Sequence, residues 1–258
     1  MFSNLFVFKN KNNYCIINEK DKPIKLNLDI FKNDTIIDIV HYEKLIILLE
    51  NRLIYADFNP ENSNNVIITK IIELDRKLKK IIIVSEYYFI GQDNLLYKLG
   101  DNNELLLVFE SEITYNHGAY FVSENKTYLI DTNIRQITDF PTKIVWEYKS
   151  KYAILLDDEG NYYYEGCGYM LSLFYFKSLI KNQKHIGDNL FKLEFSHKFT
   201  KLEIVSAITY FLDEGKLYKV LTYYPQVEVK EFRKDVKDIF TYCDALYIHV
   251  NSNEIKIM

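Results

Sequence analysis

One short pattern recurs along the sequence and constrains the fold more than any other feature. An apolar run is followed by a turn rich in Asp, Asn or Gly, and then by a second run that carries a tyrosine. The clearest copy is LLDDEGNYYYEG at residues 155–166, and another is ITYFLDEGKLYKVL at residues 208–221. Short apolar runs on either side of such a turn are typical of β-hairpins. We therefore expect an all-β chain.

Seven copies of this hairpin can be counted, and their spacing predicts the higher-order fold. The copies occupy residues 5–18, 45–57, 88–100, 119–131, 153–166, 208–221 and 245–258. The tyrosines of the second runs, at 55, 97, 128, 163 and 218, are 42, 31, 35 and 55 residues apart. Repeats of about 40 to 50 residues are typical of propeller blades.

Further strand-like runs flank most copies and complete a four-stranded unit. They precede the hairpin at 35–40, 79–84, 142–148, 201–206 and 236–242, and follow it at 24–28, 66–71, 104–109, 135–140 and 227–232. The sequence therefore predicts four-stranded antiparallel blades in a single β-propeller domain over residues 1–258. Seven blades are expected, with six as the alternative. The first copy lacks a leading strand and the last lacks a trailing one, so strands 4–8 and 254–258 are expected in the same or adjacent blades.

The hairpins resemble the repeat of the regulator of chromosome condensation family. The resemblance rests on GQDNLLYKLGDN at 91–102, DEGNYYYEG at 158–166 and DEGKLY at 213–218, and in this degenerate form it covers most of the chain. It implies a seven-bladed propeller. The family's Trp-Gly pair is replaced by Leu99-Gly100 and Glu165-Gly166. The family's nucleotide-exchange and chromatin-binding activities need specific loop residues. These residues cannot be matched to positions of this sequence, so neither activity is predicted for this chain.

Composition narrows the class of partner and the compartment. A net charge of −4 and a count of only four arginines disfavour a nucleic-acid partner, so duplex DNA binding is expected to be weak. Three widely spaced cysteines predict reduced, buried or half-buried thiols rather than disulfides or a zinc site. No apolar run approaches the roughly 20 residues of a membrane helix. An intracellular, cytoplasmic protein is expected. The Lys-, Asn- and Ile-rich composition suggests an AT-rich genome such as that of a giant DNA virus, in which case a viral factory or virion is the alternative location.

Residue patterns that carry chemistry are scarce. The five histidines are dispersed, and no Gly-x-Ser-x-Gly, phosphate-binding loop or dinucleotide fingerprint occurs. No catalytic residue, metal site or cofactor is therefore predicted. The interpretation is a non-enzymatic scaffold that binds a protein partner. A chromatin- or nucleic-acid-associated regulator and a propeller enzyme with an unidentified site are the alternatives.

The longest spacing marks the candidate site. Between Tyr163 and Tyr218 the chain carries about 15 to 20 residues more than the other repeats, which predicts an insertion at about 167–190. Residues 168–183 are the best helix candidate, with Leu171, Phe174, Tyr175, Leu179 and Ile180 on one apolar face. Insertions in repeat proteins often lie on the binding face, and aromatic anchors supply much of the binding energy. The alternative is a loop that packs on the rim. The partner-binding candidates are Tyr169, Leu171, Phe174, Tyr175, Lys177, Lys181 and Lys184.

Overall fold

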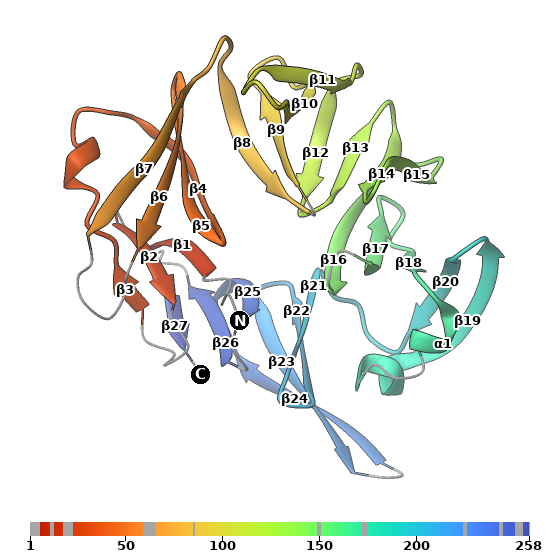
Figure 1. Cartoon of the computed structure of the whole chain (residues 1–258). Coiled ribbons are helices and arrows are strands. Elements are labelled where there is room, and N and C mark those ends of the chain that lie inside the picture. The colour runs from red at the N-terminus through yellow and green to blue at the C-terminus, as the bar shows by residue number, and fades with distance from the viewer. Residues whose placement is uncertain are drawn as a thin grey trace. The chain divides into compact units, whose positions relative to one another are not determined.

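The structure is a computed structural model in which the described residues are almost entirely β-strand (Figure 1). It describes residues 6–10, 13–17, 23–58, 65–84, 86–148, 151–171, 175–223, 226–242, 245–250 and 255–257. The chain forms two compact units, Met1–Glu124 with Ile130–Thr132, and Asn125–Leu129 with Asn133–Met258. The strands of the described residues form seven antiparallel sheets that follow one another along the sequence.

The first unit contains three of these sheets. The first is three-stranded, in the order β1-β2-β3, and the next two, β4-β5-β6-β7 and β11-β10-β9-β8, are four-stranded. A 3₁₀ helix, η1, lies at Asp29–Phe31. The strands are β1 Phe6–Asn10, β2 Asn13–Ile17, β3 Pro23–Lys25, β4 Ile36–Tyr42, β5 Lys44–Leu49, β6 Arg52–Phe58, β7 Val66–Glu73, β8 Leu78–Ile83, β9 Tyr87–Gly91, β10 Leu96–Leu99 and β11 Leu105–Phe109.

The four-stranded sheet β12-β13-β14-β15 follows in sequence, and three further sheets belong to the second unit. These are the five-stranded β16-β17-β18-β20-β19, the four-stranded β21-β22-β23-β24 and the three-stranded β25-β26-β27. Two short helices, α1 at Gly168–Leu171 and η2 at Tyr175–Leu179, precede β19. The strands are β12 Ile113–His117, β13 Tyr120–Ser123, β14 Lys126–Ile130, β15 Ile134–Thr138, β16 Thr142–Tyr148, β17 Tyr152–Asp157, β18 Tyr162–Glu165, β19 Ile180–Gly187, β20 Leu190–Phe195, β21 Lys201–Val205, β22 Ile208–Asp213, β23 Lys216–Tyr223, β24 Gln226–Arg233, β25 Val236–Tyr242, β26 Ala245–Val250 and β27 Ile255–Ile257.

The prediction of an all-β chain built from antiparallel four-stranded repeats is confirmed. In every sheet except β16-β17-β18-β20-β19, consecutive strands pair to form a meander, which is the construction of a β-propeller blade. Residues 1–5, 251–254 and 258 lie outside the described residues, and they include parts of the two predicted terminal strands. The expected three-stranded first and last repeats are present as β1–β3 and β25–β27.

The turn of the hairpin explains why its sequence repeats. Between β17 and β18, Gly160 adopts φ of 85°, and Asp157 Oδ1 accepts the backbone N–H groups of Glu159 and Asn161 at 3.0 and 2.8 Å. Tyr163 on the second strand donates its hydroxyl to the other carboxylate oxygen of Asp157 at 2.9 Å. An aspartate that binds its own turn favours a tight reversal.

The same pairing occurs in an earlier repeat. Tyr97 donates to Asp93 Oδ2 at 2.5 Å, and Asp93 Oδ1 accepts the N–H of Leu95 at 3.1 Å. The acidic turn and the tyrosine that recur in the sequence therefore form one hydrogen-bonded unit in both hairpins.

Three features of the sheets differ from the prediction. The expected helix over 168–183 is wrong, because Ile180 begins a strand and, of the described residues in this range, only those of α1 and η2 are helical. One sheet has five strands rather than four. Strands β12 and β20 are absent from the prediction. β12 is the leading strand of the sheet β12-β13-β14-β15, and β20 follows the hairpin β17–β18 in the next sheet.

Candidate protein-binding surface

The chain leaves β18 through a turn that only glycine can form. Gly166 adopts φ of 142°, and a Cβ there would lie 2.5 Å from Tyr152 Cδ1. A Cβ on Gly168 would lie 2.6 Å from the ring of Phe191. Both glycines of the Gly-Cys-Gly stretch are therefore required by the geometry of this turn. The chain then passes through α1, η2 and β19 before β20 pairs with β18.

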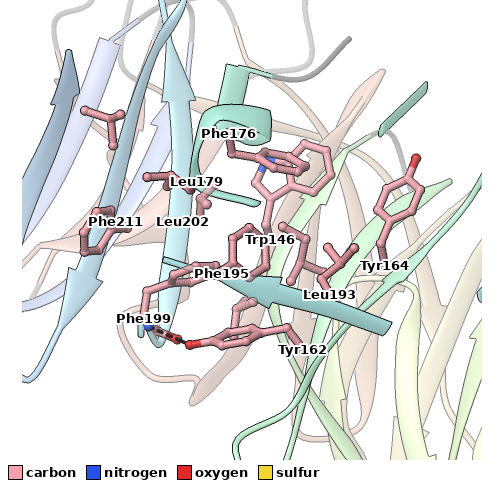
Figure 2. Close-up of a cluster of buried hydrophobic side chains, with 13 residues drawn as sticks. Trp146, Tyr162, Tyr164, Phe176, Leu179, Leu193, Phe195, Phe199, Leu202 and Phe211 are labelled. Carbon is pink, nitrogen blue, oxygen red and sulfur yellow. Dashed lines mark hydrogen bonds between the residues drawn. The ribbon is translucent and has the colours of Figure 1, made fainter. Parts of the chain in front are cut away.

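Part of this segment is anchored in the core of the second unit. Phe176 and Leu179 in η2 are buried, and the Phe176 ring packs edge-on against Trp146 with centroids 5.0 Å apart (Figure 2). The same cluster contains Phe195 from β20 and Phe199 from the following loop. Phe199 is held there because its N–H and C=O bind the hydroxyl of Tyr162, at 2.6 and 2.8 Å. Burial of this kind fixes the segment to the sheet.

The remainder of the segment faces solvent. Tyr169 is 71% exposed, and the lysines at 177, 181 and 184 are exposed as well. Leu171 lies in α1 and Tyr175 lies in η2, and of these two residues only the backbone is described; Phe174 lies outside the described residues. The predicted apolar face is therefore only partly placed. Its Leu179 is buried, and the dominant anchor, Phe176, was not among the predicted contacts.

A basic hollow lies beside the exposed lysines. Its volume is about 400 Å³. The walls come from the β17–β18 turn, from β19 and β20 and from the loop after β20, and its charged lining residues are Lys184, Lys192, Glu194 and Lys198. Lys192 also lies over the ring of Tyr163, 5.8 Å from its centroid. The three lysines outnumber the one carboxylate, so the hollow is suited to an anionic group.

A second hollow, of about 450 Å³, lies between β15 and the β19–β20 turn. It contains an ion pair in which Arg135 Nη2 lies 2.5 Å from Glu165 Oε1. The Glu165 side chain is only 3% exposed, whereas that of Arg135 is 44% exposed. A buried carboxylate needs such a partner because burial alone strongly disfavours its charge.

One carboxylate on a leading strand has a strongly shifted pKa. Glu203 on β21 is half-buried, and burial raises its pKa to about 7. Asp238 adds to this shift, while Lys201 and a 3.0 Å hydrogen bond from the Thr241 hydroxyl partly offset it. Sequence reasoning missed this group because burial of a strand residue depends on the neighbouring sheet. Among the described residues, no group of three or more His, Cys, Asp or Glu side chains is placed to hold a metal ion.

The thiols agree with the prediction only in part. Cys15 is buried, and burial raises its pKa despite the opposing charge of Lys25. Cys167 is exposed, so the expectation of a buried or half-buried thiol is wrong there. The reason is that the glycine turn carries it away from the sheet. Cys243 lies outside the described residues.

The fold and this surface define a class: an all-β repeat protein of propeller-blade sheets, one of which carries an extra, exposed, basic strand. No protein-family model and no curated protein sequence matches the chain. A solved structure titled "Crystal structure of BBS1N in complex with ARL6DN, soaked with mercury" is similar with 11% identity and a TM-score of 0.48, over 98% of this chain and 90% of that one. None of the helices that the structure describes is long and apolar enough to span a membrane.

Proposed function

We propose that this protein is a non-enzymatic β-propeller scaffold that binds a protein partner through the segment at 167–190. In this proposal the seven sheets of the described residues are seven blades, and the repeat belongs with the regulator of chromosome condensation type. The acidic turn that is hydrogen-bonded to a tyrosine in two hairpins supports that kinship.

One observation carries the proposal. Of the sheets in the described part of the chain, only β16-β17-β18-β20-β19 exceeds four strands, and seven of the eight residues of the added strand are exposed. A strand that adds little to the core and presents backbone and side chains to solvent is suited to recognition. The exposed Tyr169 adds an aromatic anchor of the kind that is enriched in binding hot spots.

The compartment is also part of the proposal. We place the scaffold inside the cell, and the exposed free thiol of Cys167 supports this, because unpaired exposed thiols persist in reducing compartments.

The test is affinity capture from the cell that expresses the protein, using the full chain. The variant carries Tyr169→Ser, Lys177→Gln and Lys181→Gln, all at exposed positions. We expect the variant to fold normally and to lose the captured partner.

The control carries Phe232→Ser, Lys143→Gln and Lys237→Gln, which remove one exposed aromatic and two exposed lysines elsewhere in the same unit. A partner that both variants retain equally would contradict the assignment of this surface.

A further inference from the structure

The outer edge of β19 is open to pairing with another strand. β19 is the last strand of its sheet, and among the strands that the structure describes it pairs with β20 alone, on its inner side. All of its residues after Ile180 are exposed. In an antiparallel pair, the N–H and C=O groups of alternate residues point away from the partner strand, so the outer edge presents a row of such groups. An extended peptide can add to an edge of this kind by main-chain hydrogen bonding.

The charge of this edge restricts which strand can add to it. Lys184 lies directly opposite Lys192 in the β19–β20 register. Like charges at directly opposed positions destabilise a sheet, because their side chains share one face at close range. In the described part of the chain, no ion pair joins either lysine to a carboxylate. The two positive charges are therefore available to an incoming anion.

The surroundings strengthen this charge. Both lysines line the basic hollow, and Lys198 adds a third positive group to its wall. Between Lys177 and Lys201 the sequence has six lysines and two acidic residues, in a chain whose net charge is −4. The region is thus a local positive patch on an acidic protein. Opposite charge accelerates encounter and disfavours partners of like charge.

A second copy of this chain is a poor match for the edge. Pairing of two β19 edges would bring Lys181 and Lys184 of one copy close to the same lysines of the other. Lysines at a sheet edge discourage self-pairing in this way. The same residues favour a strand that carries carboxylates.

We propose that the edge of β19 binds an extended acidic segment of a partner protein, which adds as a sixth strand and directs carboxylates toward Lys184 and Lys192. This inference rests on the proposed scaffold function and specifies the chemistry of its partner. Side chains of an added strand alternate between faces, so acidic residues at every second position would lie on the lysine face. The hollow beside these lysines accommodates the side chains that project from that face.

The test uses the full chain and synthetic eight-residue peptides, which match the length of β19. The first peptide alternates threonine with glutamate, and the second alternates threonine with lysine. Two further versions of the acidic peptide carry N-methyl groups, one on every odd residue and one on every even residue. Single-stranded oligothymidylate serves as a flexible polyanion. Binding is measured by fluorescence anisotropy at physiological salt.

We expect the acidic peptide to bind, and the lysine peptide and oligothymidylate not to bind. Of the two N-methylated acidic peptides, one should lose binding and the other should retain it. The reason is that an added strand donates to β19 from alternate residues only. The protein variant Lys184→Gln/Lys192→Gln should weaken binding about three- to tenfold, as expected for two exposed charge pairs. The control Lys143→Gln/Lys237→Gln removes the same charge elsewhere in the unit and should leave binding unchanged. The first variant should remain folded, since it removes a repulsive pair.

Three results would overturn the inference. The first is that the acidic peptide does not bind. The second is that both N-methylated peptides bind as well as the parent peptide, which would show that no strand pairs with β19. The third is that oligothymidylate binds as tightly as the acidic peptide, which would identify a general polyanion site. If a captured protein is lost from the Tyr169, Lys177 and Lys181 variant but retained by the Lys184 and Lys192 variant, the scaffold function stands and this inference is removed. If both variants retain the captured protein, both proposals are removed.

Discussion

Replacement of Phe176 by alanine tests whether the inserted segment is part of the core. The Phe176 side chain is fully buried, and its ring contacts Trp146 at 5.0 Å and Phe195 at 6.4 Å between centroids. Truncation of a buried phenylalanine removes its burial and leaves a cavity, which costs about 3–5 kcal/mol. That is a large part of the roughly 5–15 kcal/mol by which a typical protein is stable.

The chain offers a site-specific probe for this measurement. Trp146 is its only tryptophan, and it lies in the same cluster as Phe176. Urea unfolding followed by tryptophan fluorescence therefore reports on the second unit alone. With an m-value of about 2 kcal/mol/M, the expected loss of about 4 kcal/mol lowers the midpoint by about 2 M. Native emission should also shift to the red, because the cavity admits water beside the indole.

The matched control is Lys177→Ala, one residue further along η2 and exposed. It should change stability by no more than about 0.5 kcal/mol. A Phe176→Ala midpoint within the error of the control would refute the reasoning, since it would mean that the η2 segment contributes nothing to the core.

Three further changes are expected to alter stability in defined directions. Tyr163→Phe removes the hydroxyl that donates to Asp157 and should lower the free energy of unfolding by about 1–2 kcal/mol, measured in urea. Folded Glu203 holds its proton up to about pH 7, whereas an exposed glutamate in the unfolded chain loses it near pH 4.5, so stability should fall as pH rises between these values. Glu203→Gln should abolish this fall and be more stable by about 2–3 kcal/mol above pH 7; an unchanged pH profile would disprove the burial argument. Gly166→Ala, with its Cβ 2.5 Å from Tyr152, should lower stability by more than about 1 kcal/mol in a thermal melt.

The hairpins were predictable because their signal is local. Turn residues and alternating apolar runs lie within a dozen residues of each other, so no knowledge of the neighbouring sheets is needed. The predicted strands 142–148 and 236–242 have the same bounds as β16 and β25. A signal for β20 was also present, since Phe191, Leu193 and Phe195 alternate with polar residues. These residues lie between the predicted insertion at about 167–190 and the predicted strand at 201–206, and the prediction assigns them to neither.

Strand β19 could not have been predicted from its own residues. Its sequence, IKNQKHIG, has neither the alternation nor the β-branched content of a half-buried strand. It is a strand because β20 presents a free edge beside it, and that edge exists only once the sheet has formed. Pairing with β20 therefore determines that these residues form a strand. The tertiary structure likewise determines which of the neighbouring aromatic side chains is buried.

The anchoring of β19 has a consequence for its role. A strand that is hydrogen-bonded on one side and exposed along its length gains little stability by itself. Leu179 immediately precedes it and, together with Phe176, is buried against the sheet, so burial there holds the start of the strand in place. The lysines after it are then free to serve recognition, because the fold does not depend on them. Substitutions of the two buried η2 residues, Phe176 and Leu179, should therefore reduce binding and stability together, whereas substitutions of Lys184 or Lys192 should reduce binding alone.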